Sequence, residues 1–138
     1  PWTPLDRLLA TSRVLSLHLA LTPDTRGFMG RERLAALPPG AFLVNTARGP
    51  LVDETALREA ILAGHLAGAA LDVLDREESG GNPFTDLQEG VVTPHVAGMT
   101  SGAVERALRM GADNVGRFLR GEPLVGVVSQ PGSAPKAG

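Results

Sequence analysis

The 138-residue sequence contains no cysteine and no tyrosine, and aromatic residues make up only 4% of it. Without cysteine, the chain forms no disulfide and no thiolate metal site, and its composition fits a reducing, cytoplasmic compartment. With so few aromatic side chains, no stacking platform for single-stranded nucleic acid is expected. No apolar run approaches the roughly 20 residues that a membrane-spanning helix needs. Neither a nucleic acid nor a membrane is therefore expected as a partner.

Charge and hydropathy place the chain among globular proteins. The formal net charge is −2, and the basic residues are scattered, which argues against a surface for nucleic acid or anionic lipid. Hydrophobic residues make up 43% of the sequence and charged residues 20%, as in folded domains with a core. The sequence begins with Pro1 and has no signal-like segment. We expect it to be the C-terminal fragment of a longer protein.

Short apolar runs alternate with helical patterns along the chain. Turn residues bound runs that we expect to be strands, over 14–21, 41–45, 66–73 and 91–93. Helices are expected over 5–10, 31–37 and 101–120, and between Asp53 and Gly64. The alternation predicts right-handed βαβ units, and therefore a Rossmann-type, doubly wound parallel α/β sheet. Four strands make about half of a dinucleotide-binding domain.

Details of the helices and of two histidines follow from the same patterns. Asp53 and Ser101 are expected to cap the helices that follow them. His18 is expected to pack within its strand, and His65 to follow a helix C-terminus. The buried face of the helix after Asp53 is expected to contain Leu57, Ile61 and Leu62, and the last helix is expected to carry one apolar stripe, of Val104, Leu108, Val115, Phe118 and Leu119.

Three of the apolar runs are followed by chemically useful side chains, namely Arg48, Glu77 and His95. The carboxyl ends of parallel strands lie along one edge of a sheet, where open α/β folds bind ligands. A guanidinium binds a planar carboxylate and stabilises charge on a carbonyl oxygen. An imidazole exchanges protons near neutral pH, and a neighbouring carboxylate favours its protonated form. This combination is typical of a dehydrogenase.

Each of these residues also has a purely structural interpretation. Arg48 could be a surface arginine at a helix N-terminus, although the helix dipole disfavours a cation there. A lone histidine such as His95 is more often a structural residue than a catalytic one. Glu77 could belong to a solvated acidic loop, and Asp72 could be an ordinary turn residue at the end of its strand.

Three segments together resemble the D-isomer-specific 2-hydroxyacid dehydrogenase family, which includes phosphoglycerate, glycerate and D-lactate dehydrogenases. Segment 37–53 reads LPPGAFLVNTARGPLVD, segment 64–73 reads GHLAGAALDV, and segment 93–98 reads TPHVAG. Their order and spacing are similar to those of the family, and the resemblance extends from Leu5 to Val128. It implies the C-terminal half of the family's NAD-binding domain over 1–121. Helix 101–120 then returns toward another domain, and 122–138 form a return segment with a disordered tail.

The resemblance implies a role for each candidate residue in the reduction of a 2-oxo acid to a 2-hydroxy acid. Arg48 would bind and polarise the oxo acid, His95 would act as acid and base, and Glu77 would orient His95. The family's proline after the catalytic glutamate is replaced here by Glu78, so Glu78 remains an alternative to Glu77. The residues expected to contact NAD or NADP are Leu19, Ala20, Thr46, Ala47, Arg48, Asp72, His95 and Gly98.

Two other functions remain open from the sequence. Some relatives act as NAD-sensing, corepressor-like binding modules, and others in the same superfamily oxidise formate or phosphite. The parent protein is expected to be a cytoplasmic homodimer acting on a small 2-oxo or 2-hydroxy acid. No cluster of histidine and carboxylate residues has the spacing of a metal site, so no metal is expected.

The first prediction concerns the isolated chain. Its sequence contains no G-x-G-x-x-G turn, the element that seats the pyrophosphate of a dinucleotide. We therefore expect the 138-residue chain to bind NAD only weakly and to show no turnover. A calorimetric titration with NAD, and an assay of glyoxylate or hydroxypyruvate with NADH, measure both. Measurable turnover would contradict the prediction.

Overall fold

The elements follow the predicted alternation of helices and strands. A computed structural model describes residues 2–75 and 82–128. The chain divides into two compact units, residues 1–97 and residues 98–138. The first unit contains α1 (Leu5–Thr11), β1 (Val14–Leu17), α2 (Arg31–Ala35), β2 (Ala41–Asn45), the 3₁₀ turn η1 (Gly49–Leu51), α3 (Glu54–Leu62), β3 (Leu66–Leu71) and β4 (Gly90–Val92); the second contains α4 (Ser101–Leu119).

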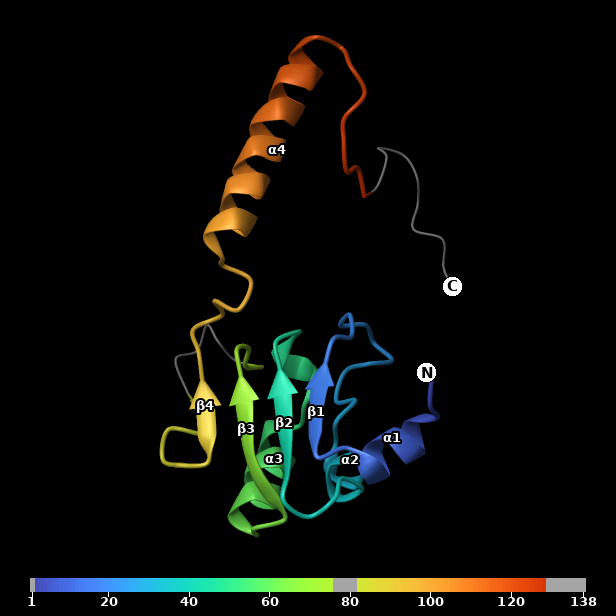
Figure 1. The fold of residues 1–138 in the computed structure, drawn as a ribbon, viewed down its shortest axis with the longest axis vertical. Coiled ribbons are helices and arrows are strands. Elements are labelled where there is room, and N and C mark those ends of the chain that lie inside the picture. The colour runs from blue at the N-terminus through green and yellow to red at the C-terminus, as the bar shows by residue number, and fades with distance from the viewer. Residues whose placement is uncertain (1, 76–81, 129–138) are drawn as a thin grey trace. The chain divides into compact units, whose positions relative to one another are not determined.

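The four strands form one parallel sheet in the order β1-β2-β3-β4. Figure 1 shows the four arrows side by side and pointing the same way, with α3 behind the sheet. Each strand pairs with the next one along the chain, as right-handed βαβ connections produce on one side of a doubly wound sheet. The predicted α/β fold class is confirmed, and all four carboxyl ends lie along one edge.

One face of the sheet carries the core. In register across the sheet, Leu15, Leu43 and Ala69 are buried on this face. Leu34 of α2 and Leu57 of α3 pack into the same core. On the opposite face, Val14, Phe42 and Val91 are exposed. The sheet of this unit is therefore covered by helices on one face.

Helix α3 is well defined at both ends. The Asp53 carboxylate accepts a hydrogen bond from the Ala56 amide at 3.0 Å, which is the predicted N-cap. After the helix, Gly64 adopts a φ of +70°, a backbone conformation that glycine enters without a Cβ clash. Leu57 and Ile61 are buried as predicted, but Leu62 is 63% exposed, so its predicted burial is wrong. Leu62 directly follows Ile61, about 100° further round the helix and off the apolar stripe.

The predicted first strand is too long, because β1 ends at Leu17 rather than at 21. The Thr25 hydroxyl donates to the Ala20 carbonyl at 2.7 Å and accepts from the Thr22 amide at 2.8 Å. These side-chain bonds form a turn that competes with a strand ladder. His18 is consequently exposed beyond the strand, where its Nε2 lies 2.9 Å from the Ser16 hydroxyl, and the expectation that it packs inside is wrong.

The last helix begins one residue earlier than its predicted cap would place it. Thr100, not Ser101, is the N-cap, and its hydroxyl accepts from the Ala103 amide at 3.2 Å. None of the described side chains of α4 is buried, including the predicted apolar stripe. Within the helix, the side chain of Asn114 exchanges two 2.9 Å hydrogen bonds with the backbone of Val125, which lies in the chain after the helix.

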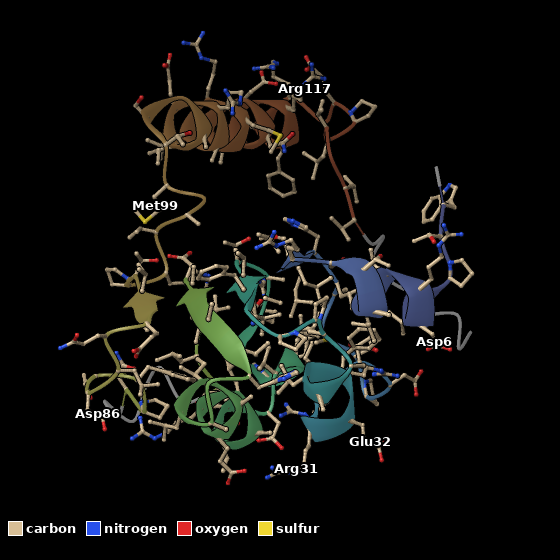
Figure 2. All side chains as sticks on the ribbon, turned by 60° about the horizontal axis from the view of Figure 1, so that its bottom comes forward. Asp6, Arg31, Glu32, Asp86, Met99 and Arg117 are labelled. Atoms are coloured by element: carbon tan, nitrogen blue, oxygen red, sulfur yellow. The ribbon has the colours of Figure 1, made fainter. Side chains whose placement is uncertain are left out.

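Ion pairs gather on the helical side of the first unit. Arg31 of α2 pairs with Glu59 of α3, and the Arg58 guanidinium makes two bonds to the Asp86 carboxylate, at 2.7 and 2.6 Å. Figure 2 shows Arg31 and Asp86 at the end of the sheet opposite the strand tips. These charged side chains pair with one another away from the carboxyl edge of the sheet. In the described parts of the chain, no helix has both the length and the hydropathy to cross a bilayer.

Two leucines of α3 offer a matched test of the core. Leu57 is fully buried and Leu62 is exposed, yet both lie on the same helix. We expect Leu57→Ala to lower the free energy of unfolding by about 2–5 kcal/mol, because it removes packed methyl groups and leaves a cavity. We expect Leu62→Ala to change it by less than about 0.5 kcal/mol. Urea unfolding followed by circular dichroism measures both, and equal losses would contradict this account of the core.

Candidate active site

Two cavities lie at the carboxyl edge of the sheet. The arginine cavity, of about 510 Å³, follows β1 and β2 and is lined by His18, Leu19, Ala20, Leu21, Ala47 and Arg48. The histidine cavity, of about 390 Å³, follows β3 and β4 and is lined by Asp72, Leu74, Asn82, Val92, Thr93, Pro94 and His95. Strands two apart in a sheet are separated by about 10 Å, so the end of β2, which precedes Arg48, and the end of β4, which precedes His95, are about that far apart.

Arg48 lies in a loop whose backbone is hydrogen-bonded to a buried side chain. Asn45, the last residue of β2, is 1% exposed. Its Nδ2 donates to the Arg48 carbonyl at 2.9 Å, and its Oδ1 accepts from the Ala47 amide at 3.0 Å. The Arg48 backbone is extended, and its guanidinium donates to the Ala47 carbonyl at 2.6 Å. The exposed cation therefore projects from a fixed turn.

The residue after Arg48 must be a glycine for a packing reason. A Cβ on Gly49 would lie 2.0 Å from the carbonyl carbon of Leu74 and 2.4 Å from the amide nitrogen of Asp75. Both contacts are with backbone, which cannot rotate out of the way. The arginine loop is therefore packed directly against the chain that leaves β3.

The loop that carries His95 is held by the carboxylate of Asp72. This side chain is 4% exposed at the end of β3. One oxygen accepts hydrogen bonds from the Thr93 hydroxyl and, at 2.8 Å, from the Val96 amide. The other oxygen accepts from the Ala97 amide, also at 2.8 Å. An acid at the end of one strand thus organises the loop after the next.

These bonds also keep Asp72 ionised. The Thr93 hydroxyl contributes most to holding the pKa of Asp72 below its usual value, and the amides of Ala97 and Val96 and the nearby His95 act in the same direction. Burial alone would raise that pKa, so the hydrogen bonds outweigh the loss of hydration. The site therefore contains a fixed negative charge near the imidazole, supplied by the residue that directly follows β3.

His95 is the only described residue other than glycine with a positive φ, at +55°. Its amide donates to the Thr93 carbonyl at 2.9 Å, which closes a tight turn through Pro94. A left-handed backbone costs a residue with a Cβ about 1 kcal/mol or more, and such residues are frequent at functional sites. The turn exposes the imidazole at the histidine cavity, where it can exchange a proton with a bound molecule.

Most of the predicted site residues reach one of the two cavities. Leu19, Ala20, Ala47 and Arg48 line the first, and Asp72 and His95 line the second. Thr46 is exposed directly after β2. Gly98 belongs to the second unit. Glu77 and its alternative Glu78 lie outside the described residues, so their predicted roles stay predictions.

Three polar residues of the edge were not predicted from the sequence: Asn45, Thr93 and Asn82. The sequence does contain a signal for Asn45, because a polar residue at the end of the apolar run 41–44 must find buried partners. Thr93 lies within the TPHVAG segment and binds Asp72. The Asn82 carboxamide oxygen accepts from the Phe84 amide at 2.9 Å, in a turn that no local pattern distinguished.

The chemistry available at this edge is that of anion binding and proton transfer. Arg48 supplies a permanent cation and His95 a titratable group, and the arginine cavity is lined by the apolar residues Leu19, Ala20 and Leu21 as well as by polar groups. Such a mixed lining suits a molecule with both an uncharged and a charged part. Within residues 2–75 and 82–128, no three histidine or carboxylate side chains converge in a way that could hold a metal ion.

Comparison with protein families gives a match to one family model. The model is described as D-isomer specific 2-hydroxyacid dehydrogenase, NAD binding domain, and it matches residues 1–97. These residues coincide with the first structural unit. The matched part therefore includes the four-stranded sheet and both cavities.

Individual relatives agree with that match. A D-3-phosphoglycerate dehydrogenase of Mycobacterium bovis is 45% identical over 118 residues, which are 86% of this chain but 22% of the relative. A 2-hydroxyacid dehydrogenase of Xanthobacter autotrophicus, solved with NADPH and MES, is 42% identical with a TM-score of 0.74, covering 91% of this chain and 51% of that one. An enzyme of Lactobacillus delbrueckii in its NAD complex is 30% identical with a TM-score of 0.84, covering 93% and 43%. The chain thus spans only part of the relatives that it matches.

The bond between Thr93 and Asp72 can be tested by pH. A carboxylate with a lowered pKa stabilises the fold above its unfolded pKa, and that contribution is lost as the pH falls through the folded pKa, here below about pH 4. Thr93→Val removes the hydroxyl that lowers the pKa most. We expect the variant to be less stable than the parent at pH 7, and the difference to shrink below pH 4.

Urea unfolding at neutral and acidic pH measures this difference. Thr55→Val, at an exposed threonine of α3, is the matched control and should leave the pH dependence unchanged. A gap between Thr93→Val and the parent that stays constant down to acidic pH would show that the hydroxyl does not act through the charge of Asp72.

Proposed function

The chain belongs to the D-isomer specific 2-hydroxyacid dehydrogenase family, as its NAD-binding domain, and on that premise we propose that it serves the reversible reduction of a 2-oxo acid to a D-2-hydroxy acid. The observation that carries the proposal is the placement of Arg48 and His95 at cavities along one sheet edge, each on a loop held by a buried polar residue. A permanent cation and a proton donor, both fixed, are what carbonyl reduction requires of a protein.

Arg48 has two tasks in the proposed reaction. Its planar guanidinium binds the substrate carboxylate with two parallel hydrogen bonds. It also lies where negative charge develops on the carbonyl oxygen, and it stabilises that charge in the transition state more than in the ground state. Because Asn45 fixes its loop before substrate arrives, little reorganisation is needed.

His95 handles the proton. In the reducing direction the protonated imidazole donates to the carbonyl oxygen, and in the oxidising direction the neutral ring accepts the hydroxyl proton. We further propose that Glu77, or Glu78 in its place, orients His95, as the family resemblance implies.

A nicotinamide dinucleotide supplies the hydride when it is bound. Leu19, Ala20 and Ala47 are apolar residues that line the arginine cavity and could contact an uncharged nicotinamide ring. Related structures have been solved with NADPH and with NAD, so either dinucleotide remains compatible with the proposal. Contacts of Thr46, Asp72 and Gly98 with the cofactor, a homodimeric parent protein and a cytoplasmic location are parts of the same proposal.

The test is an assay of the complete protein that carries this chain. The loss of NADH or NADPH absorbance is followed with glyoxylate, hydroxypyruvate and pyruvate. The gain of that absorbance from NAD or NADP is followed with formate and phosphite. Turnover of an oxo acid supports the proposal. Oxidation of formate or phosphite alone, or dinucleotide binding without turnover of any substrate, would contradict it in favour of the two alternative functions.

A substitution of Arg48 tests the proposed role of its guanidinium. Arg48→Lys keeps the charge but loses the bidentate geometry, so we expect kcat/KM for the oxo acid to fall on the order of 100-fold. Arg109→Lys, at an exposed residue of α4 paired with Glu105, is the control and should leave kcat/KM unchanged. Equal kinetics of the two variants would remove Arg48 from the reaction.

A further inference from the structure

Asn45 is a polar residue at a buried position of the sheet. It lies on the core face of β2, in line with Ala41 and Leu43, and only it and Asp72 are buried polar or charged residues in the part of the chain that the structure describes. A buried carboxamide lowers stability unless its donor and acceptor are both bonded. An apolar residue would fill this position at less risk, so the contacts of Asn45 indicate what the amide does.

Both ends of the Asn45 carboxamide bind the backbone around Arg48. The Oδ1 holds the Ala47 amide and the Nδ2 holds the Arg48 carbonyl, at 3.0 and 2.9 Å. These two groups belong to the peptides that enter and leave the Ala47–Arg48 pair. Fixing both peptides fixes the direction in which the Arg48 side chain leaves the backbone.

The same residue ties the arginine loop to the neighbouring strand. The Asn45 carbonyl accepts a hydrogen bond from the Asp72 amide at 2.9 Å, and Gly49 packs against the backbone of Leu74. Asp72 in turn binds the loop of His95 through its carboxylate. The loops that carry Arg48 and His95 are therefore both bound to the end of β3.

We infer that Asn45 is a positioning residue that fixes the direction of the Arg48 side chain relative to His95. The inference rests on the proposed reduction of a 2-oxo acid, in which Arg48 binds the substrate. It assigns to Asn45 no contact with substrate or cofactor: its effect passes entirely through two backbone bonds.

The chemistry of the carboxamide makes this role separable from simple packing. In Asn45→Asp the ionised side chain presents an oxygen to the Arg48 carbonyl, and two acceptors repel each other. When that acid is protonated, its O–H can donate to the carbonyl while the other oxygen still accepts from Ala47. Burial raises the pKa of such a carboxyl, which brings the change into an accessible range. Asn45→Ala has no such group, and its defect should not depend on pH.

The experiment measures kcat and KM of the complete protein between about pH 8 and about pH 5. At the upper pH we expect Asn45→Asp to lower kcat/KM for the oxo acid by about 10-fold to 100-fold. The deficit should shrink toward pH 5, whereas that of Asn45→Ala stays constant.

Asn114→Asp is the matched control. Asn114 makes the same pair of bonds to one backbone segment, at Val125, but in the second unit. If Asn45→Asp and Asn114→Asp have the same kinetics at every pH, the inference is wrong. Circular dichroism checks folding at each pH. Should Asn45→Asp unfold at the upper pH, Asn45→Ser replaces it, and the expected loss is then the same at all pH values.

A second measurement separates this inference from the proposed function. Hydrogen exchange of segment 46–49, followed by mass spectrometry, should be about 10-fold faster in Asn45→Ala than in Asn114→Asp under the same conditions. Faster exchange with no oxo acid turnover in the parent would retain the loop contact and reject the reaction, and with it the role of Asn45 in aiming Arg48. Unchanged exchange would overturn the inference even in an active enzyme.

Discussion

The buried carboxylate of Asp72 is the group on which the candidate site depends most. An ionised acid inside a sheet is strongly unfavourable unless donors surround it, and here the donors come from residues 93–97. The burial of Asp72 therefore depends on the bonds from the loop after β4. Through its amide, Asp72 also binds Asn45, so one residue joins the supports of both loops.

Much of this arrangement was readable in the sequence because it follows from local rules. The apolar run 41–45 is bounded by Pro-Pro-Gly on one side and a polar loop on the other, and β2 covers the same residues. Asp53 caps α3, and Gly64 ends it, because each residue suits a specific backbone position. Parallel pairing then brings Arg48 and His95 to one edge without any knowledge of contacts.

The parts that could not be predicted depend on contacts between distant segments. The bonds of Thr25 turn the chain away from β1, and nothing in the aliphatic run 14–21 reveals them. The exposure of Leu62 follows from which side of α3 meets the sheet. Asp72 was predicted to contact the cofactor, and that stays a prediction; the bonds of its carboxylate to the His95 loop were not predicted, because they are visible only once β3 and β4 lie side by side.

The left-handed backbone of His95 has a consequence for how any change at this position would be interpreted. A glycine there would lose the imidazole and relieve the backbone at the same time, so the two effects could not be separated in that variant. An asparagine tolerates this conformation better than most side chains and would isolate the chemistry more cleanly. The chain thus retains a locally unfavourable conformation at the residue proposed to transfer the proton, and a search for greater stability alone would select against it.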